Sequence, residues 1–226
     1  MSRVVKDADV RREELLDTAL GLFLEHGYDR TSVEQITQAV GVAKGTFYHY
    51  FATKDALLEQ LVDRYSERLF EDIEKALAEV DGSALERFRV LMASSATAKM
   101  VRRDETMLVT ASLYRDDNRE MLDRMREGWM GRLRPAIADI VAQGVKDGDF
   151  DVPDVSGFTD VCLSLWLDYG VRIGRHFFEV RGDKVRMQEV YSALDTLVIA
   201  VERILKAEPG SLAIDPTPVY KAIATM

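Results

Sequence analysis

Residues 31–51 have the sequence TSVEQITQAVGVAKGTFYHYF, and this stretch decides the fold. Thr31 and Glu34 have the T-x-x-E spacing of a capping box, which predicts that Thr31 caps the helix that follows. Three apolar residues then recur at helical spacing and predict an inward face: Val33, Ile36 and Val40. Gly41 suits the sharp turn after this helix, because glycine accepts positive φ at little cost.

A second short helix is predicted over residues 43–51, and its residues divide between two faces. One face is predicted to pack in the core: Ala43, Phe47, Tyr50 and Phe51. The opposite face has two i,i+4 pairs: Lys44 with Tyr48, and Gly45 with His49. A cation, polar aromatic rings and a glycine that permits close approach favour a helix laid in a DNA groove and bound to phosphates.

The string VEQITQAVGVAKGTFYHYFATKDALL, residues 33–58, resembles the helix-turn-helix signature of the TetR family of bacterial transcriptional repressors. The matching features stand at fixed spacing: Gly27, Tyr28, Thr31, Val33, Ile36, Ala39, Gly41, Val42, Lys44, Gly45, Tyr48, Phe51, Lys54 and Leu57. Two positions depart from the pattern. Ala43 stands where the family usually has a Ser or Thr cap, and Thr37 stands where a small Ala is common.

This resemblance implies an all-α, ligand-responsive repressor without enzymatic activity that binds a pseudo-palindromic, double-stranded DNA operator as a homodimer. A three-helix DNA-binding domain is expected in residues 1–54, and a ligand-binding and dimerisation domain of about six helices in residues 55–226. The expected DNA contacts are Thr31, Ser32, Ala43, Lys44, Gly45, Thr46, Tyr48, His49 and Lys54. Lys44 is expected at a base edge, whereas Tyr48, His49 and Lys54 are expected mostly at phosphates. A phosphate near Lys54 would offset the unfavourable position of a cation at a helix N-terminus.

Composition agrees with a cytoplasmic globular protein of one or two domains. The 226 residues are 47% hydrophobic and 31% charged, and Cys162 is the single cysteine, which suits a reducing compartment. The N-terminus has no apolar signal segment, and no apolar run approaches the roughly 18 residues of a membrane span. We therefore expect no membrane partner.

The net charge of −9 argues against DNA binding at first sight. Residues 1–54 carry seven basic and eight acidic side chains, so the predicted DNA-binding segment is nearly neutral and the remainder is acidic. DNA affinity is therefore expected to depend on a few well-placed cations and on backbone donors at helix N-termini. The arm at residues 1–8 and the cations after it either reach DNA or are simply solvated.

Helices are also predicted at residues 9–26, 54–80, 83–99, 104–114, 119–146, 154–180 and 184–206. Pro135 predicts a kink or break in the fifth of these, and the tail after Lys206 is expected to be extended or disordered. The last two helices carry surplus apolar surface, which predicts a four-helix dimer interface: Leu163, Leu167, Leu194, Leu197, Val198 and Val201.

A small, largely apolar effector is expected inside the bundle, because five methionines fall within residues 92–125 and suit an adaptable pocket. The predicted lining residues are Met92, Met107, Trp129, Cys162, Trp166 and Tyr169. The alternatives are a constitutive or architectural DNA-binding regulator without an effector, and a helical-bundle enzyme. The three histidines lack metal-ligand spacing and no nucleophile or phosphate-loop motif occurs, so no catalytic residue, metal or cofactor is predicted.

Overall fold

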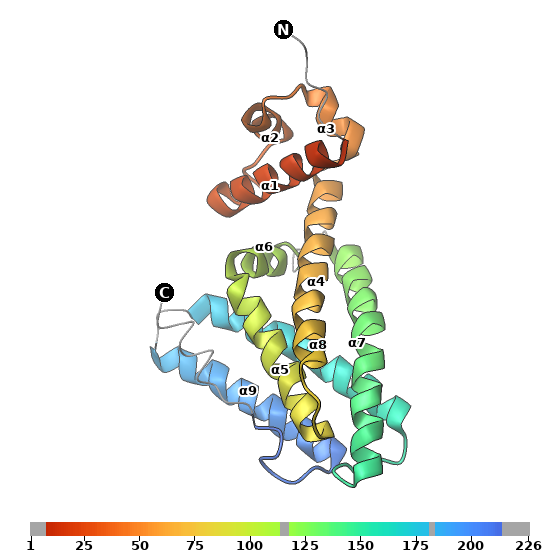
Figure 1. Cartoon of the computed structure of the whole chain (residues 1–226). Helices are drawn as coiled ribbons and strands as arrows, with labels where there is room; N and C mark the ends of the chain where they lie inside the picture. Colours follow the sequence, from red (N-terminus) through yellow and green to blue (C-terminus); the bar gives the residue numbers. More distant parts are fainter. Residues whose placement is uncertain (1–7, 114–117, 181–183, 214–226) are drawn as a thin grey trace. The chain divides into compact units, whose positions relative to one another are not determined.

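The computed structural model describes residues 8–113, 118–180 and 184–213, and this part of the chain contains α-helices and no strand (Figure 1). The helices are α1 (Ala8–His26), α2 (Val33–Val40), α3 (Lys44–Tyr50), α4 (Lys54–Ala78), α5 (Ala84–Val101), α6 (Arg103–Leu113), α7 (Arg119–Asp147), α8 (Val155–Val180) and α9 (Lys184–Leu205). The predicted all-α fold, with a helix-turn-helix followed by a helical C-terminal region, is confirmed.

The chain forms two compact units whose boundary falls inside α4. Unit 1 contains residues 1–67 and 104–121, so α6 belongs with the first three helices. Unit 2 contains residues 68–103 and 122–226. These units are groups of residues in close contact, and they do not test where the DNA-binding domain ends. The predicted domain boundary after residue 54 therefore stays a prediction.

Unit 1 is built on an apolar core that α1, α2, α3 and the first half of α4 share. Its fully buried side chains are Leu15, Leu16, Ala19, Phe23, Ile36, Phe47, Phe51, Leu57 and Leu58. Arg64 of α4 donates to Glu13 at 2.9 Å and to Asp17 at 2.8 Å, which ties α4 to α1. Between α4 and α6, the buried hydroxyls of Tyr65 and Thr106 lie 2.9 Å apart. These polar contacts hold α1 and α6 against the same segment of α4.

Unit 2 is held by an apolar core and by ion pairs between its helices. Helices α8 and α9 pack against each other, and the core includes Phe88, Leu91, Ile137, Ile140, Leu163 and Leu205. The ion pairs join α5 to α7, α7 to α4 and α7 to α8: Arg87 with Asp139, Arg132 with Glu74, and Arg134 with Asp160. The Arg134 guanidinium lowers the pKa of Asp160, because it stabilises the ionised carboxylate.

Of the two alternatives predicted at Pro135, a kink or a break, the break is excluded because helix α7 continues through this residue. The prediction for the tail after Lys206 is corrected. The chain after α9 does not simply extend, because Glu202 accepts from the backbone N–H of Gly210 at 3.1 Å and of Leu212 at 2.8 Å. Leu212 is fully buried, so residues 206–213 fold back on α9, whereas residues 214–226 lie outside the described part.

Candidate DNA-binding site and ligand-binding region

The N-terminal cap of α2 is Ser32, one residue later than predicted. Its hydroxyl accepts from Gln35 N at 3.2 Å, and Gln35 Oε1 accepts from Ser32 N at 2.7 Å, which completes a capping box. Thr31 is 1% exposed, and its hydroxyl donates instead to the carbonyl oxygen of Gly27 at 2.9 Å. Thr31 therefore stabilises the preceding loop and its side chain is buried, whereas Ser32 is exposed.

The turn between α2 and α3 has the predicted form. Gly41 has φ 75° and ψ 36°, a left-handed conformation that glycine adopts at low cost. Its N–H bonds the carbonyl oxygen of Gln38 at 3.1 Å, and the N–H of Val42 bonds that of Thr37 at 2.9 Å. These two bonds end α2 and fix the direction in which α3 begins.

Helix α3 presents its polar face to solvent and buries two aromatic rings. Phe47 and Phe51 are 0% and 1% exposed, as predicted for core residues. The other two predicted core residues are not buried, since Tyr50 is half-buried and Ala43 is exposed as an N-cap without a side-chain hydrogen bond. The exposed residues of α3 are Lys44, Gly45, Tyr48 and His49, and Thr46 is half-buried beside them.

No neighbouring atom in the chain requires residue 45 to be a glycine. A Cβ added at Gly45 would meet no atom within 4 Å, and its φ is not positive. Glycine inside a helix is nevertheless less favourable than alanine by about 1 kcal/mol. The open space at Gly45 therefore lies where an external molecule can approach the backbone.

Lys54 is held by the loop between α1 and α2. Its ammonium donates to the main-chain oxygens of Tyr28 at 2.8 Å and Thr31 at 2.9 Å, and it lies 4.1 Å from the centroid of the Tyr28 ring. The Tyr28 hydroxyl in turn donates to Asp55. These internal contacts explain a cation at the start of α4 without any phosphate.

Arg30 is an exposed cation beside α2 that was not among the predicted DNA contacts. Arg30 lies two residues before the Ser32 cap, and its Nε donates to the main-chain oxygen of His26 at 2.7 Å. This bond anchors the guanidinium stem near the N-terminus of α2. Nearby in sequence, Arg11 pairs with Glu14 and Arg12 with Glu13, and the arm at residues 1–7 lies outside the described part.

The predicted ligand-lining residues are not gathered around one described hollow. Met92, Trp129 and Cys162 are buried in the core of unit 2, and burial raises the pKa of the Cys162 thiol to about 11. Trp166 and Tyr169 are half-buried on α8. Met107, also half-buried, belongs to unit 1, so the proposed cluster does not lie within a single unit.

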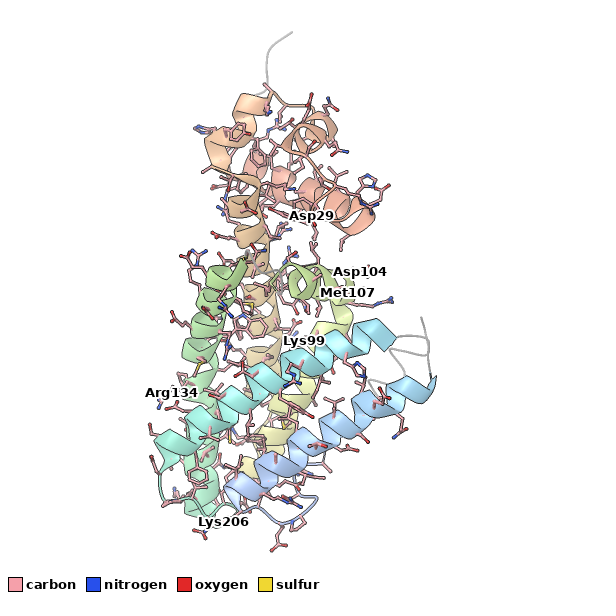
Figure 2. The ribbon with its side chains drawn as sticks, turned by 180° about the vertical axis from the view of Figure 1, so that it is seen from behind. Asp29, Lys99, Asp104, Met107, Arg134 and Lys206 are labelled. Atoms are coloured by element: carbon pink, nitrogen blue, oxygen red, sulfur yellow. The ribbon has the colours of Figure 1, made fainter. Side chains whose placement is uncertain are left out.

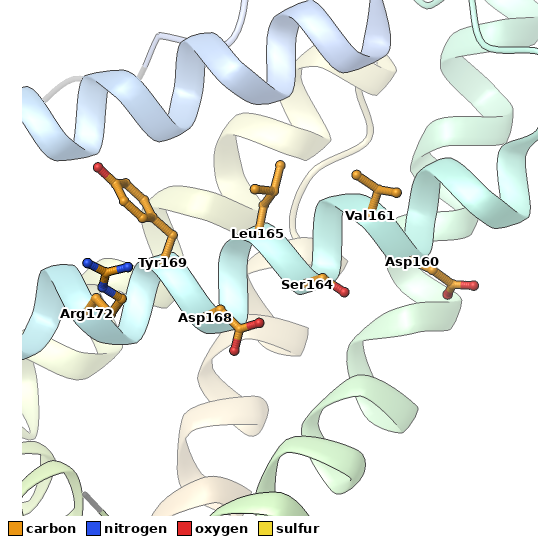
Figure 3. Close-up of a pocket in the computed structure, with 7 residues that line it drawn as sticks. All are labelled: Asp160, Val161, Ser164, Leu165, Asp168, Tyr169 and Arg172. Atoms are coloured by element: carbon orange, nitrogen blue, oxygen red, sulfur yellow. The ribbon is translucent and has the colours of Figure 1, made fainter.

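A hollow of about 510 Å³ lies along α8. Figure 3 shows its seven lining side chains, which all project from that helix: Asp160, Val161, Ser164, Leu165, Asp168, Tyr169 and Arg172. Only Tyr169 among them is a predicted ligand-lining residue. Because one helix supplies the whole lining, this hollow is a surface of α8 rather than the predicted pocket between several helices.

The residues predicted for the dimer interface mostly lie inside the chain's own core. Leu163, Leu167, Leu197, Val198 and Val201 are at most 8% exposed, and Leu194 is half-buried. A residue that one chain already buries adds little area to a contact with a second chain, and the predicted dimer interface stays a prediction. Among the side chains of α8 and α9 that the structure describes, the exposed large apolar ones are Val161 and Ile199, at 48% and 45%.

Other kinds of site find no support in the described part of the chain. Its histidine, cysteine and acidic side chains form no group of three that could hold a metal ion. Within the same residues, no helix is both long and apolar enough to cross a membrane.

Known proteins resemble this chain in sequence. Residues 15–61 match the family described as "Bacterial regulatory proteins, tetR family". The "HTH-type transcriptional repressor AcnR" of Corynebacterium diphtheriae is 30% identical over 139 residues, which are 58% of this chain and 72% of that protein. The chain belongs to the TetR family. It is therefore a DNA-binding transcriptional regulator, as the helix-turn-helix predicted.

The similarity of this TetR-family chain to known regulators extends beyond its helix-turn-helix. The "HTH-type transcriptional repressor KstR2" of Rhodococcus jostii is 29% identical over 195 residues, which are 83% of this chain and 91% of that protein. The structure of FadR from Bacillus subtilis in complex with stearoyl-CoA has a TM-score of 0.62 at 18% identity, over 82% of this chain and 97% of that one. At that identity the likeness concerns the fold alone.

Proposed function

We propose that this TetR-family regulator represses transcription as a homodimer on a pseudo-palindromic operator and is released by a small, largely apolar effector. The observation that carries the DNA-binding part is the exposed face of α3. It presents Lys44, Tyr48 and His49 around a glycine whose missing side chain has no use inside the protein. Close contact between α3 and DNA would explain this glycine, because a side chain at position 45 would occupy the space between them.

Each exposed group on this face has a distinct proposed role. Lys44 reads a guanine edge in the major groove, because its position in the first turn of α3 is where recognition helices contact bases. Tyr48, which is 51% exposed, and His49 hydrogen-bond phosphates. Ser32, Ala43 and Thr46 lie at the edge of the contact, and Arg30 supplies a further phosphate contact beside α2.

Lys54 takes a different role from the one first expected. Its ammonium already donates to two loop carbonyls, so we assign it to positioning α4 against the helix-turn-helix. In the same way, Thr31 supports the loop from within and contributes to DNA binding only indirectly.

Dimerisation is proposed through the outer faces of α8 and α9. On α8 the exposed or half-buried positions follow helical spacing at Val161, Leu165 and Tyr169. On α9 they follow it at Thr196, Ile199 and Arg203. Two copies that pair through these faces form a four-helix interface with two-fold symmetry, and such symmetry matches a pseudo-palindromic DNA site.

An effector is proposed to bind within unit 2. Buried Met92 and Trp129 supply apolar, polarisable contact surface there. A family relative of the same fold, FadR from Bacillus subtilis, has been solved in complex with stearoyl-CoA, which supports a ligand with a large apolar part. The effector must bind more tightly to a conformation with low operator affinity, since equal affinity for both conformations would release nothing.

The experiment that tests DNA binding is selection of genomic fragments by the purified full-length protein, followed by sequencing. The enriched fragments are expected to share a two-fold-related sequence with half-sites about one helical turn apart. Binding to that operator is then measured for Tyr48→Phe and Lys44→Ala beside the wild type. A protein that enriches no common sequence contradicts the proposal.

Release by an effector is tested on the same operator fragment. Compounds that change the fluorescence of Trp129 or Trp166 are expected to dissociate the operator complex over the same concentration range. If no compound that alters this fluorescence changes operator affinity, a constitutive regulator without an effector is the better description.

A further inference from the structure

Arg64 of α4 binds two carboxylates of α1 with a single nitrogen. Its Nη1 donates to Glu13 Oε2 at 2.9 Å and to Asp17 Oδ1 at 2.8 Å. The Arg64 side chain is 14% exposed, but those of Glu13 and Asp17 remain open to solvent, at 47% and 68%. Ion pairs with such open partners add little to the free energy of folding. Arg64 can therefore fix the position of α1 without being required for the fold.

A second polar contact joins the same region to α4 nearer the start of that helix. Lys54 donates to two main-chain oxygens of the loop that follows α1. Lys54 and Arg64 are ten residues apart in α4, which corresponds to about 15 Å along a helix. A single anchor would let α1 pivot on α4, whereas two anchors at this separation also fix its direction.

The apolar contacts of unit 1 constrain this direction less strictly than the polar ones do. The buried core that α1 and α4 share includes Leu15, Leu16, Leu57 and Leu58. The attraction between such side chains is non-directional, so it holds the helices together without specifying one angle. Charge-assisted hydrogen bonds are geometrically specific. The contacts of Arg64 therefore add an angular constraint to the apolar core.

The residue that follows Arg64 ties α4 to a further helix of unit 1. The hydroxyls of Tyr65 and Thr106 lie 2.9 Å apart, and both side chains are buried. Thr106 belongs to the part of α6 that Asp104 and Met107 mark in Figure 2. Because neighbouring residues of α4 bind α1 and α6, the position of α1 is set against two helices rather than one.

We propose that Arg64 sets the half-site spacing that this regulator accepts in its operator. The inference rests on the proposed function, since spacing has a meaning only for a dimer with two recognition helices. Helices α1, α2 and α3 share one core, so a change in the angle of α1 on α4 moves α3 as well. In a two-fold dimer the change occurs in both copies and alters the separation of the two α3 helices. Arg64 acts through α1 as a positioning residue, not through a DNA contact.

Four DNA duplexes test this proposal on the full-length protein. They are the operator selected from genomic fragments, the same operator with one base pair added or removed at its centre, and a single half-site. One base pair changes the half-site separation by about 3.4 Å and rotates one half-site against the other by about 35°. The wild type is expected to bind the operator about 10-fold or more tightly than either spacing variant, because displaced half-sites lose base contacts.

Arg64→Met is expected to bind the operator about 10-fold more weakly and to lose most of the preference for its spacing. Its affinity for the single half-site is expected to stay unchanged, because each α3 keeps its own contacts with DNA. A second variant removes the charge of both acceptors instead, with Glu13→Gln and Asp17→Asn combined. It should reproduce the effect of Arg64→Met, and it decides the question if Arg64→Met does not fold, as measured by circular dichroism.

Arg87→Met is the matched control. Arg87 likewise donates to two acceptors on another helix, Asp139 at 2.7 Å and Gln143 at 2.6 Å, but it joins α5 to α7 within unit 2. This variant is expected to keep the spacing preference of the wild type. A general loss of ion pairs between helices would instead affect both arginine variants alike.

The inference is overturned if Arg64→Met keeps the spacing preference, or if it binds the operator and the half-site more weakly by the same factor. It also fails if Arg87→Met changes the preference as much. In these cases a wild type that still prefers its operator leaves the proposed function intact. If the wild type binds all four duplexes equally well, the proposed dimeric recognition of the operator fails together with this inference.

Discussion

Lys54 Nζ lies 2.8 Å from the main-chain oxygen of Tyr28, and this bond joins the first turn of α4 to the loop between α1 and α2. The same loop also receives a bond from Lys54 at Thr31, while Asp55 accepts from the Tyr28 hydroxyl. Lys54 thus binds the backbone of this loop, and Asp55 binds the Tyr28 side chain of the same loop. The contact fixes how α4 leaves the helix-turn-helix.

Lys54→Met is expected to lower both the thermal stability of the protein and its operator affinity. Hydrogen bonds to charged groups contribute about 1.5–3 kcal/mol, and the loss should weaken binding to all DNA sequences alike. Thermal unfolding and binding at several salt concentrations test this. A positioning role leaves the slope of log affinity against log salt unchanged, whereas loss of a phosphate contact reduces it by about 0.9.

Gly45→Ala is expected to stabilise the free protein and weaken operator binding. Alanine favours a helix over glycine by about 1 kcal/mol, but the added Cβ would occupy space that DNA is proposed to fill, at a cost of about 1–3 kcal/mol. Gly21→Ala is the matched control, since Gly21 lies in α1 with open space around it. A variant at Gly45 that binds operator as tightly as wild type argues against close approach.

Lys44→Ala and Tyr48→Phe are expected to differ in what they do to specificity. Loss of a base-edge contact at Lys44 should cost about 1–3 kcal/mol on the operator and relax the preference at one base pair. Loss of the Tyr48 hydroxyl should weaken operator and non-operator DNA by a similar factor. Competition binding with single-base-pair variants of the operator measures both effects. Unchanged affinity in both variants would remove α3 from the interface.

Val161→Glu and Ile199→Glu are expected to give folded monomers that no longer bind operator. Both residues are exposed in the single chain, so a charge there is tolerated until a second chain covers it. Sedimentation measures whether the chains associate, and circular dichroism measures whether each variant is folded. Val145→Glu serves as the control, because Val145 is another exposed valine of unit 2. A wild-type protein that sediments as a monomer at micromolar concentration contradicts the dimer.

Lys99 is expected to make the stability of the protein depend on alkaline pH. Its pKa falls from 10.5 to about 8 on folding, so between these values the unfolded chain binds more protons than the folded one. The free energy of unfolding therefore increases as the pH rises from about 8 to 10.5, because the folded chain releases the Lys99 proton at a lower pH than the unfolded chain does. Chemical denaturation of wild type and Lys99→Met should show the variant more stable at pH 7 and the difference narrowing above pH 8. A difference that stays constant with pH would contradict the shifted pKa.

Local sequence signals predicted the helix-turn-helix well. Hydrophobic spacing and the glycines at 27 and 41 located the helix ends to within about two residues, because both signals act through nearby backbone geometry. The cap of α2 was placed one residue early, since Thr31 with Glu34 and Ser32 with Gln35 both satisfy the same spacing. Burial of the Thr31 side chain decided between them, and burial depends on the tertiary fold.

Longer-range features of unit 2 were less predictable. The apolar stripe at Leu197 and Val201 is the same in sequence whether its partner is another helix of the chain or a second chain. Apolar composition around Trp129 likewise could not distinguish a core from a ligand pocket. Lys99 was missed because it belongs to no motif, and only its burial makes it unusual.

The return of residues 206–213 onto α9 limits how the protein can be labelled. Glu202 is 4% exposed, and its carboxylate relies on the N–H groups of Gly210 and Leu212. Cutting the chain directly after α9 would leave a buried negative charge without those donors, a defect that commonly costs about 3–5 kcal/mol. Fluorescent reporters or affinity handles intended for this regulator should therefore be attached beyond Ala213, where they leave this carboxylate satisfied.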